Sequence, residues 1–221
     1  MALTFDNFVA SSCSAEAVKA ARAAAEQKGE NLRPLMICAG TGLGKTHLLS
    51  AIAGETLARY PEKKVIREFC DTFTGELIWA IQHDTMEAFW EKYLQADLLL
   101  IDDLHCVAGK EYTQEIFADL FEKLRQKGST IVVTADCDAG KLLQGRLGQA
   151  LAEGIVVEIH APDYETRLEI ARRKAQEWGM DLTEAEAVGF AKAETDNIRR
   201  MEGAMRHLWA EKELGLVPRT P

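Results

Sequence analysis

Apolar residues along the chain fall into short continuous runs, separated by longer stretches of helical periodicity. Four runs have strand length, at 34–38, 97–103, 130–134 and 155–159, and Val65-Ile66 lies in a fifth, short strand candidate. The run 97–103 is apolar without polar alternation until its terminal carboxylates, which is typical of a strand buried on both faces of a parallel sheet. Strands that alternate with helices predict a doubly wound α/β fold around a five-stranded parallel sheet.

The helices predicted between these runs share long segments without helix breakers. They span 15–27, 45–60, 72–82, 85–94 and 111–126. The first is expected to end near Gly29, and Pro61 follows the second. Strands and helices therefore alternate through most of the first 160 residues.

The pattern changes at Ala161-Pro162, after which only helices are predicted. They span 163–178, 183–193 and 196–211. Asp163 and Thr183 are the predicted N-caps, and Gly179 is the predicted C-terminal stop. The chain is therefore expected to comprise an α/β core over 1–160, a small helical subdomain over 161–212 and a frayed tail over 213–221.

Composition narrows the class of protein. The 221 residues are 47% hydrophobic and 28% charged, which excludes disorder, collagen and a disulfide scaffold. No apolar run reaches the ~18 residues of a membrane span, and the N-terminus lacks the features of a secretory signal. Five scattered cysteines without a C-x-x-C pair indicate free thiols in a reducing cytoplasm. The net charge of −9 gives no indication of binding to duplex DNA, and no membrane partner is expected.

The segment 39–46 carries the strongest chemical signal. Its sequence, AGTGLGKT, fits the phosphate-binding pattern G-x-x-x-x-G-K-[ST] except for Ala39 at the first position. Glycines let backbone N–H groups turn toward phosphate oxygens, and the following helix presents the positive end of its dipole. Lys45 is expected to reach the β- and γ-phosphates and Thr46 to ligate Mg²⁺, which predicts ATP or ADP with Mg²⁺ as cofactors.

Two carboxylates, Asp102 and Asp103, end the apolar run 97–103. Open α/β sheets bind ligands at the carboxyl ends of their strands. An acidic pair at such a point is by itself most often a turn. Downstream of a phosphate loop in the same sheet, it predicts that Asp102 holds Mg²⁺ while Asp103 polarises the attacking water.

Other polar and aromatic residues favour structural roles. The five histidines show no metal-ligand spacing, so structural or surface positions are expected. The basic stretch 172–174 is interpreted as a solvated helix face, and the four tryptophans as packing anchors.

Four segments, in order, resemble the AAA+ ATPase module of the bacterial replication initiators of the DnaA family. They are 4–9, 42–49, 99–103 with 108–111, and 197–204. The resemblance extends over about 3–209, and it implies an AAA+ nucleotide-binding core followed by a helical lid. It also implies ATP binding in the initiation of replication or its regulation.

The resemblance implies a role for individual residues. Residues 5–9 would lie near the adenine, Asp136 would take the place of the sensor-1 aspartate, and Arg199 that of the sensor-2 arginine. The expected catalytic residues are Lys45, Asp103, Asp136 and Arg199. The expected nucleotide-binding residues are Phe8, Val9, Gly40, Thr41, Gly42, Leu43, Gly44, Lys45, Thr46 and His47.

The chain also departs from the family pattern. Ala150 stands where the family has its arginine finger, and Arg146 is retained one helical turn away. Tyr112 replaces a basic residue implicated in gripping single-stranded DNA. These departures predict weak intrinsic ATPase activity and weak binding of single-stranded DNA. Because no recognition helix follows the lid, no sequence-specific binding of duplex DNA is expected.

Two functional hypotheses stay open at this point. The chain is either a nucleotide switch with slow ATP hydrolysis, or a nucleotide-binding adaptor that docks on a full-length initiator or on the replicative helicase. The intact Lys45, Thr46, Asp102 and Asp103 favour the switch, whereas Ala150 favours the adaptor. A helicase-loader-type ATPase and a piece of a longer initiator are further alternatives.

Overall fold

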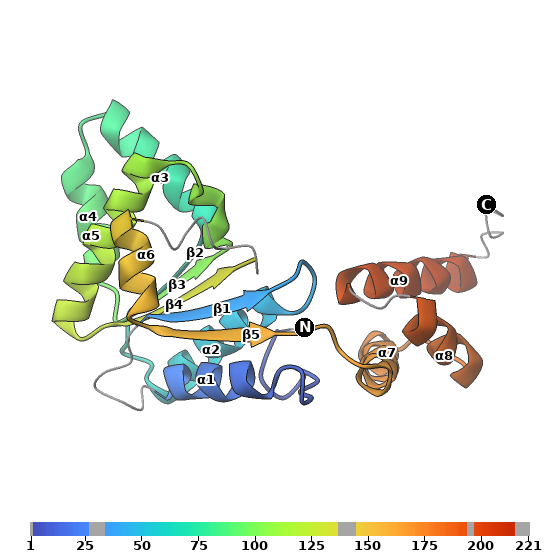
Figure 1. Ribbon diagram of the computed structural model, residues 1–221. Helices are drawn as coiled ribbons and strands as arrows, with labels where there is room; N and C mark the ends of the chain where they lie inside the picture. The colour runs from blue at the N-terminus through green and yellow to red at the C-terminus, as the bar shows by residue number, and fades with distance from the viewer. Residues whose placement is uncertain (1, 27–33, 137–144, 194–196, 215–221) are drawn as a thin grey trace. The chain divides into compact units, whose positions relative to one another are not determined.

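The computed structural model describes residues 2–26, 34–136, 145–193 and 197–214 (Figure 1). Residue contacts divide the chain into two units. The first unit comprises residues 1–8, 16–39 and 45–159, and the second comprises 9–15, 40–44 and 160–221. Among the described residues, no helix combines the length and the apolar character needed to cross a lipid bilayer.

Strands and helices alternate up to residue 159. The strands are β1 (Leu35–Ala39), β2 (Val65–Phe69), β3 (Leu98–Asp102), β4 (Thr130–Ala135) and β5 (Ile155–Ile159). The helices are α1 (Ala15–Ala25), α2 (Lys45–Arg59), α3 (Cys70–Gln82), α4 (Met86–Leu94), the 3₁₀ helix η1 (Leu104–Val107), α5 (Glu111–Lys127) and α6 (Gly145–Ala152). The three helices that follow are α7 (Tyr164–Trp178), α8 (Glu184–Ala193) and α9 (Ile198–Leu214).

The five strands form one parallel sheet in the order β2-β3-β4-β1-β5, which confirms the predicted fold class. β1 is an inner strand, in register with β4 through Ile37 and Thr134 and with β5 through Ile37 and Val157. The loop 40–44 leaves this inner strand at its carboxyl end, where ligands bind in open α/β sheets.

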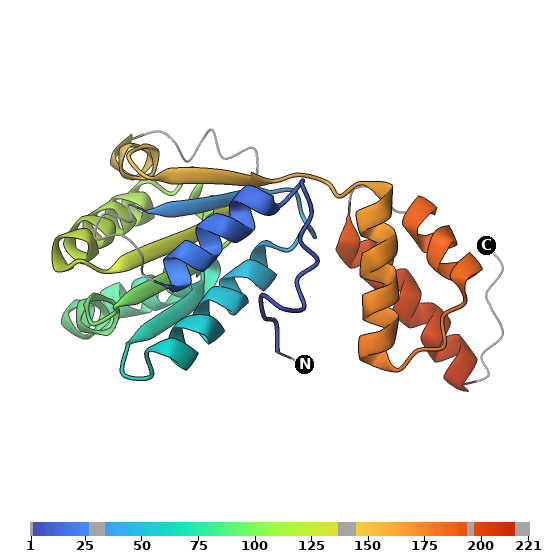
Figure 2. The ribbon, with the colours of Figure 1, turned by 90° about the horizontal axis from the view of Figure 1, so that it is seen from below.

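Side chains of the inner strands pack on alternate faces of the sheet. Leu99 and Ile101 of β3, with Val133 of β4, belong to the core cluster under α3, α4, α5 and α6. Leu98, Leu100 and Val132 point to the opposite face by the period-2 rule and are also buried. Figures 1 and 2 show α1 and α2 covering that second face. The inner strands are therefore buried on both faces and are mostly apolar, as the run 97–103 indicated.

The second unit contains the three helices α7, α8 and α9, and both ends of α7 and the start of α8 agree with the predicted signals. The Asp163 carboxylate accepts a hydrogen bond from the Thr166 N–H at 2.8 Å and caps α7. Gly179 ends α7 in the left-handed conformation, at φ 64°. Before α8, the Thr183 N–H donates to Glu186 Oε2 at 2.8 Å and the Glu186 N–H donates back to Thr183 Oγ1 at 3.3 Å. This reciprocal pair is a capping box.

The observed elements differ from the predicted ones mainly at short segments. No helix was predicted over η1 or α6, because a four-residue 3₁₀ turn is too short to show a period and Gly145 and Gly148 lower the helix propensity of α6. Helix α3 begins at Cys70 rather than at Thr72. The predicted helix end near Gly29, the predicted helix start at Asp196 and most of the predicted tail lie outside the described residues.

Candidate functional site

The loop between β1 and α2 has the backbone that its sequence predicts. Gly42 and Gly44 have φ values of 82° and 101°, in the region that side chains other than glycine rarely adopt. Helix α2 starts directly after the loop, at Lys45. The first N–H groups of this 15-residue helix lack intrahelical acceptors, so the loop and helix together offer donors suited to phosphate oxygens.

Lys45 is a buried cation, with only 6% of its surface exposed. Its Nζ donates to the Ala39 carbonyl at 2.8 Å and to Asp136 Oδ1 at 2.7 Å. Asp136 follows β4, the neighbour of β1, so the pair lies at the carboxyl ends of two adjacent strands. The structure thereby brings together two residues that are separated by 91 positions in the sequence.

Asp102 is 1% exposed and has one satisfied carboxylate oxygen. Its Oδ1 accepts a hydrogen bond from the Thr134 hydroxyl at 2.5 Å. Its Oδ2 is buried without a hydrogen-bond partner among the described residues. An unsatisfied buried carboxylate oxygen is costly, and a hard cation such as Mg²⁺ would compensate it. Asp102 therefore fits the predicted role of metal ligand, together with the half-buried Thr46 in the first turn of α2.

Asp103 departs from the strand conformation that Asp102 still has. Its φ of 58° and ψ of 45° are left-handed, a conformation that aspartate tolerates better than most residues. Its backbone N–H donates to Thr134 Oγ1 at 2.9 Å. Burial raises the pKa of the Asp103 carboxyl, and the neighbouring Asp102 charge raises it further. One hydroxyl, that of Thr134, thus holds both members of the acidic pair.

His105, in η1, lies between the carboxylates of Asp103 and Asp136. Its Nδ1 is 4.0 Å from Asp103 Oδ1, and its Nε2 is 3.6 Å from Asp136 Oδ2. Neither His105 nor Thr134 has a chemical role that the sequence alone predicts. The available signal for His105 was its position two residues after Asp103. Thr134 reaches the site through the register between β3 and β4, in which Ile101 pairs with Val133.

His47, in the first turn of α2, holds the N-terminal segment. Its Nε2 lies 2.8 Å from the Thr4 carbonyl oxygen and 3.0 Å from Asn7 Oδ1. Both are acceptors, because the Thr4 N–H already donates to Asn7 Oδ1 at 2.9 Å, so Nε2 carries the proton. The His47 ring also meets the Phe8 ring edge-on, with centroids 5.1 Å apart. The segment predicted to lie near adenine is therefore attached directly to α2.

The remaining predicted residues fall in the second unit. Within the loop, Thr41 is exposed, whereas Gly40 and Leu43 are half-buried. Val9 packs against the apolar cluster that includes Met201 of α9. Arg199 is exposed in the first turn of α9. The nucleotide-binding and sensor roles of Val9 and Arg199 stay predictions.

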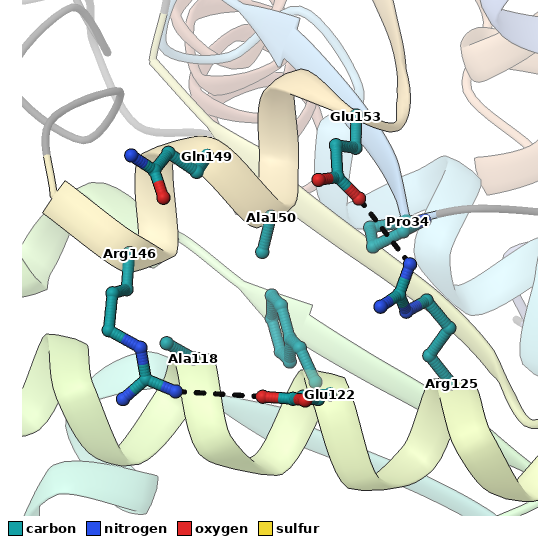
Figure 3. Close-up of a pocket in the computed structure, with 9 residues that line it drawn as sticks. Pro34, Ala118, Glu122, Arg125, Arg146, Gln149, Ala150 and Glu153 are labelled. Atoms are coloured by element: carbon teal, nitrogen blue, oxygen red, sulfur yellow. Dashed lines mark hydrogen bonds and ion pairs between the residues drawn. The ribbon is translucent and has the colours of Figure 1, made fainter.

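The segment matched to the family's arginine finger forms α6, which packs on α5 (Figure 3). Arg146 Nη1 lies 2.8 Å from Glu115 Oε2, and its Nη2 lies 2.8 Å from Asp119 Oδ1 and 3.6 Å from Glu122 Oε2. Ala150 is half-buried and lines a pocket of about 210 Å³ between the two helices. Arg146 is therefore engaged by three carboxylates of its own chain, and Ala150 offers no charge.

Comparison with known proteins agrees with this geometry. The family model of the bacterial DnaA ATPase domain matches residues 1–158. The chromosomal replication initiator protein DnaA of Gloeothece citriformis is 40% identical over 204 residues, which cover 91% of this chain and 45% of that protein. The Synechocystis DnaA is 40% identical over 219 residues, covering 98% of this chain and 49% of that protein. The chain thus spans about half the length of the curated relatives it matches.

Solved structures give the same assignment. Domain III of the Thermotoga maritima replication initiation protein DnaA superposes with a TM-score of 0.91 at 32% identity, covering 98% of this chain and 92% of that chain. A replication initiator DnaA bound to AMPPCP and single-stranded DNA has a TM-score of 0.85 at 30% identity, covering 97% of this chain and 66% of that one. The DnaC helicase loader, with a TM-score of 0.59 at 13% identity, shares the fold alone. The chain therefore belongs to the bacterial DnaA family, whose AAA+ ATPase domain it matches.

Proposed function

We propose that this chain binds ATP and ADP and acts as a nucleotide switch in the initiation of replication, with slow intrinsic hydrolysis. The observation that carries the proposal is the buried Lys45 ammonium beside the glycine-rich loop, together with Asp102 Oδ2, which has no hydrogen-bond partner in the part of the chain that the structure describes. In this proposal residues 1–160 form the nucleotide-binding core and residues 161–212 the lid.

Binding of the phosphates would change the partners of Lys45. Its ammonium now donates to the Ala39 carbonyl and to Asp136, and the charged phosphate oxygens would offer it further charge-assisted hydrogen bonds. The loop amides and the first turn of α2 would hold the remaining phosphate oxygens. Phe8, Val9 and His47 would define the space for the adenine.

The acidic groups supply the rest of the site. Thr46 and Asp102 would hold Mg²⁺, which neutralises charge on the phosphates when it is bound. Asp103 would orient the attacking water, and Asp136 would report the state of the phosphates through its contact with Lys45. Arg199 would couple the nucleotide to the lid.

The departures from the family pattern limit the activity and the partners we propose. Without a charged group at Ala150, a copy of this chain would lack the arginine that completes a neighbour's site. A DnaA relative binds single-stranded DNA together with AMPPCP. Because Tyr112 replaces a basic residue, we propose weaker binding of single-stranded DNA here. A full-length initiator and the replicative helicase are the proposed protein partners.

Nucleotide affinity tests the switch directly. ATP and ADP affinities are measured by fluorescence anisotropy for the unmodified chain, for Lys45→Ala and for Lys64→Ala, an exposed lysine as the matched control. Loss of a charged donor to phosphate is expected to weaken binding about 10- to 100-fold in Lys45→Ala and to leave the control unchanged. Unchanged affinity in a folded Lys45→Ala variant would refute the proposed site.

Turnover separates the switch from the adaptor. Slow Mg²⁺-dependent release of phosphate is expected from the unmodified chain, and Asp103→Asn is expected to remove it while nucleotide binding persists. Tight binding with no measurable turnover would instead describe an adaptor.

A further inference from the structure

Asp103, His105 and Asp136 bring three possible metal ligands together at one end of the sheet. We propose that they bind a divalent transition-metal ion, of the Mn²⁺ or Co²⁺ class, in the nucleotide-free protein. This site is distinct from the Mg²⁺ position proposed at Thr46 and Asp102, and it uses none of the same side chains.

The distances suit coordination after a small inward movement. One ring nitrogen of His105 and one carboxylate oxygen from each aspartate lie within 4.8 Å of one another. The His105 Nε2 to Asp136 Oδ2 distance is 3.6 Å, and the His105 Nδ1 to Asp103 Oδ1 distance is 4.0 Å. These are the two opposite nitrogens of one ring, so the ion binds only one of them and the carboxylate beside the other nitrogen has to move toward it. Two ligands at about 2.1 Å from one ion stand roughly 3.0 to 3.4 Å apart. Side-chain rotations of half-exposed groups can supply the difference.

The site has unused coordinating capacity. The Nδ1 atom of His105 is buried and has no hydrogen-bond partner among the described residues. The two carboxylate oxygens of Asp136 have different neighbours. Oδ1 accepts a hydrogen bond from Lys45 at 2.7 Å, whereas Oδ2 faces His105. An ion can therefore bind Oδ2 without displacing Lys45. The two aspartates repel each other, and a divalent cation between them would relieve that repulsion.

The ligand set selects the class of ion. An imidazole nitrogen suits later first-row transition metals such as cobalt, the two carboxylates also suit manganese, and Mg²⁺ prefers oxygen ligands throughout. The donors are therefore one nitrogen and two oxygens.

Titration of the full chain with Co²⁺ tests the proposal, after removal of metals with EDTA and without nucleotide. One equivalent is expected to bind and to give the weak visible absorption of cobalt in a nitrogen and oxygen environment. His105→Gln and Asp136→Asn are each expected to lower the affinity at least tenfold. His83→Gln, which alters an exposed histidine at the end of α3, is the matched control and should bind as the unmodified chain does.

Three results would overturn the proposal. They are the absence of saturable binding, an affinity unchanged in both His105→Gln and Asp136→Asn, and an intense near-ultraviolet band from cobalt bound to thiolate. Circular dichroism verifies that each variant is folded, and the two variants alter different ligands, so a folding defect in one leaves the other informative. The cobalt titration contains no nucleotide, so a failure to bind Co²⁺ would not contradict the proposed nucleotide switch. A failure to bind ATP would likewise not contradict the proposed metal site.

Discussion

At the scale of single residues, the site depends on groups that satisfy one another in pairs. The Thr134 hydroxyl donates to Asp102 Oδ1 and accepts from the Asp103 N–H. It is completely buried, so neither partner can exchange it for water. We expect Thr134 to position Asp102 and Asp103 without touching the nucleotide.

Replacing Thr134 with valine keeps the shape of the side chain and removes both hydrogen bonds. Leaving the Asp102 carboxylate and the Asp103 N–H unsatisfied is expected to cost about 1 to 3 kcal/mol of unfolding free energy. It should also lower the apparent affinity for Mg²⁺, measured from turnover, about 10- to 100-fold. Chemical denaturation and a Mg²⁺ titration of turnover measure the two effects. Thr130→Val, at the other end of β4, is the control, and an equal loss of Mg²⁺ response there would argue against a positioning role for Thr134.

Cysteine reactivity gives a second prediction at this scale. Burial raises the pKa of the Cys70 thiol to about 12, so almost none of it is thiolate near pH 8. Cys13 is only half-buried. Iodoacetamide is therefore expected to modify Cys13 in the folded chain and Cys70 only after denaturation, as read by peptide mass spectrometry. Equal modification of both in the folded chain would contradict the packing of α3.

At the scale of secondary-structure elements, the sequence predicts what depends on local pattern. β5 has the predicted bounds, 155–159, because a β-branched run stands between clear breaks. The strand order and the register of β3 against β4 could not be predicted, since they depend on contacts between distant segments. The phosphate loop and the acidic pair were recognisable as local motifs. Thr134 and His105 were not, because only the register and the turn after Asp103 bring them to the site.

The capping box of α8 allows a test of one helix end. Thr183→Ala removes the hydroxyl that accepts from the Glu186 N–H and is expected to cost about 1 kcal/mol of unfolding free energy, while Thr183→Ser retains the cap. Hydrogen bonds from Lys212, and then from Thr183, lower the pKa of Glu186. Their stabilisation is therefore complete above the ordinary glutamate pKa of about 4.3 and is lost as the pH falls through the lower pKa of the folded state.

Denaturant titrations followed by circular dichroism, repeated at neutral and acid pH, measure this effect. The difference between the unmodified chain and Thr183→Ala is expected to shrink as the pH falls below about 4. A difference that stays constant with pH would mean that Glu186 takes no part in the cap.

At the scale of the whole molecule, turnover should not depend on self-association. Arginine fingers are worth roughly 10³ to 10⁵ in rate, and Ala150 has no charge to contribute. Turnover per molecule is therefore expected to stay constant as the concentration of the unmodified chain rises. Ala150→Arg is expected to make it increase with concentration, and Ala152→Arg, an exposed position on the same helix, is the control. A steep increase in the unmodified chain would assign the finger to another residue, with Arg146 the first to test.

The position of β1 inside the sheet has a consequence for how the protein folds during synthesis. β1 ends at Ala39, yet its two neighbours in the sheet end at Ala135 and Ile159. When the phosphate loop leaves the ribosome, the strand that anchors it has no partner on either side. Pairings over such sequence separations carry a large closure entropy and form late. The nascent chain should therefore acquire ATP affinity abruptly, once β5 has emerged from the exit tunnel, with the apolar β1 in need of protection until then.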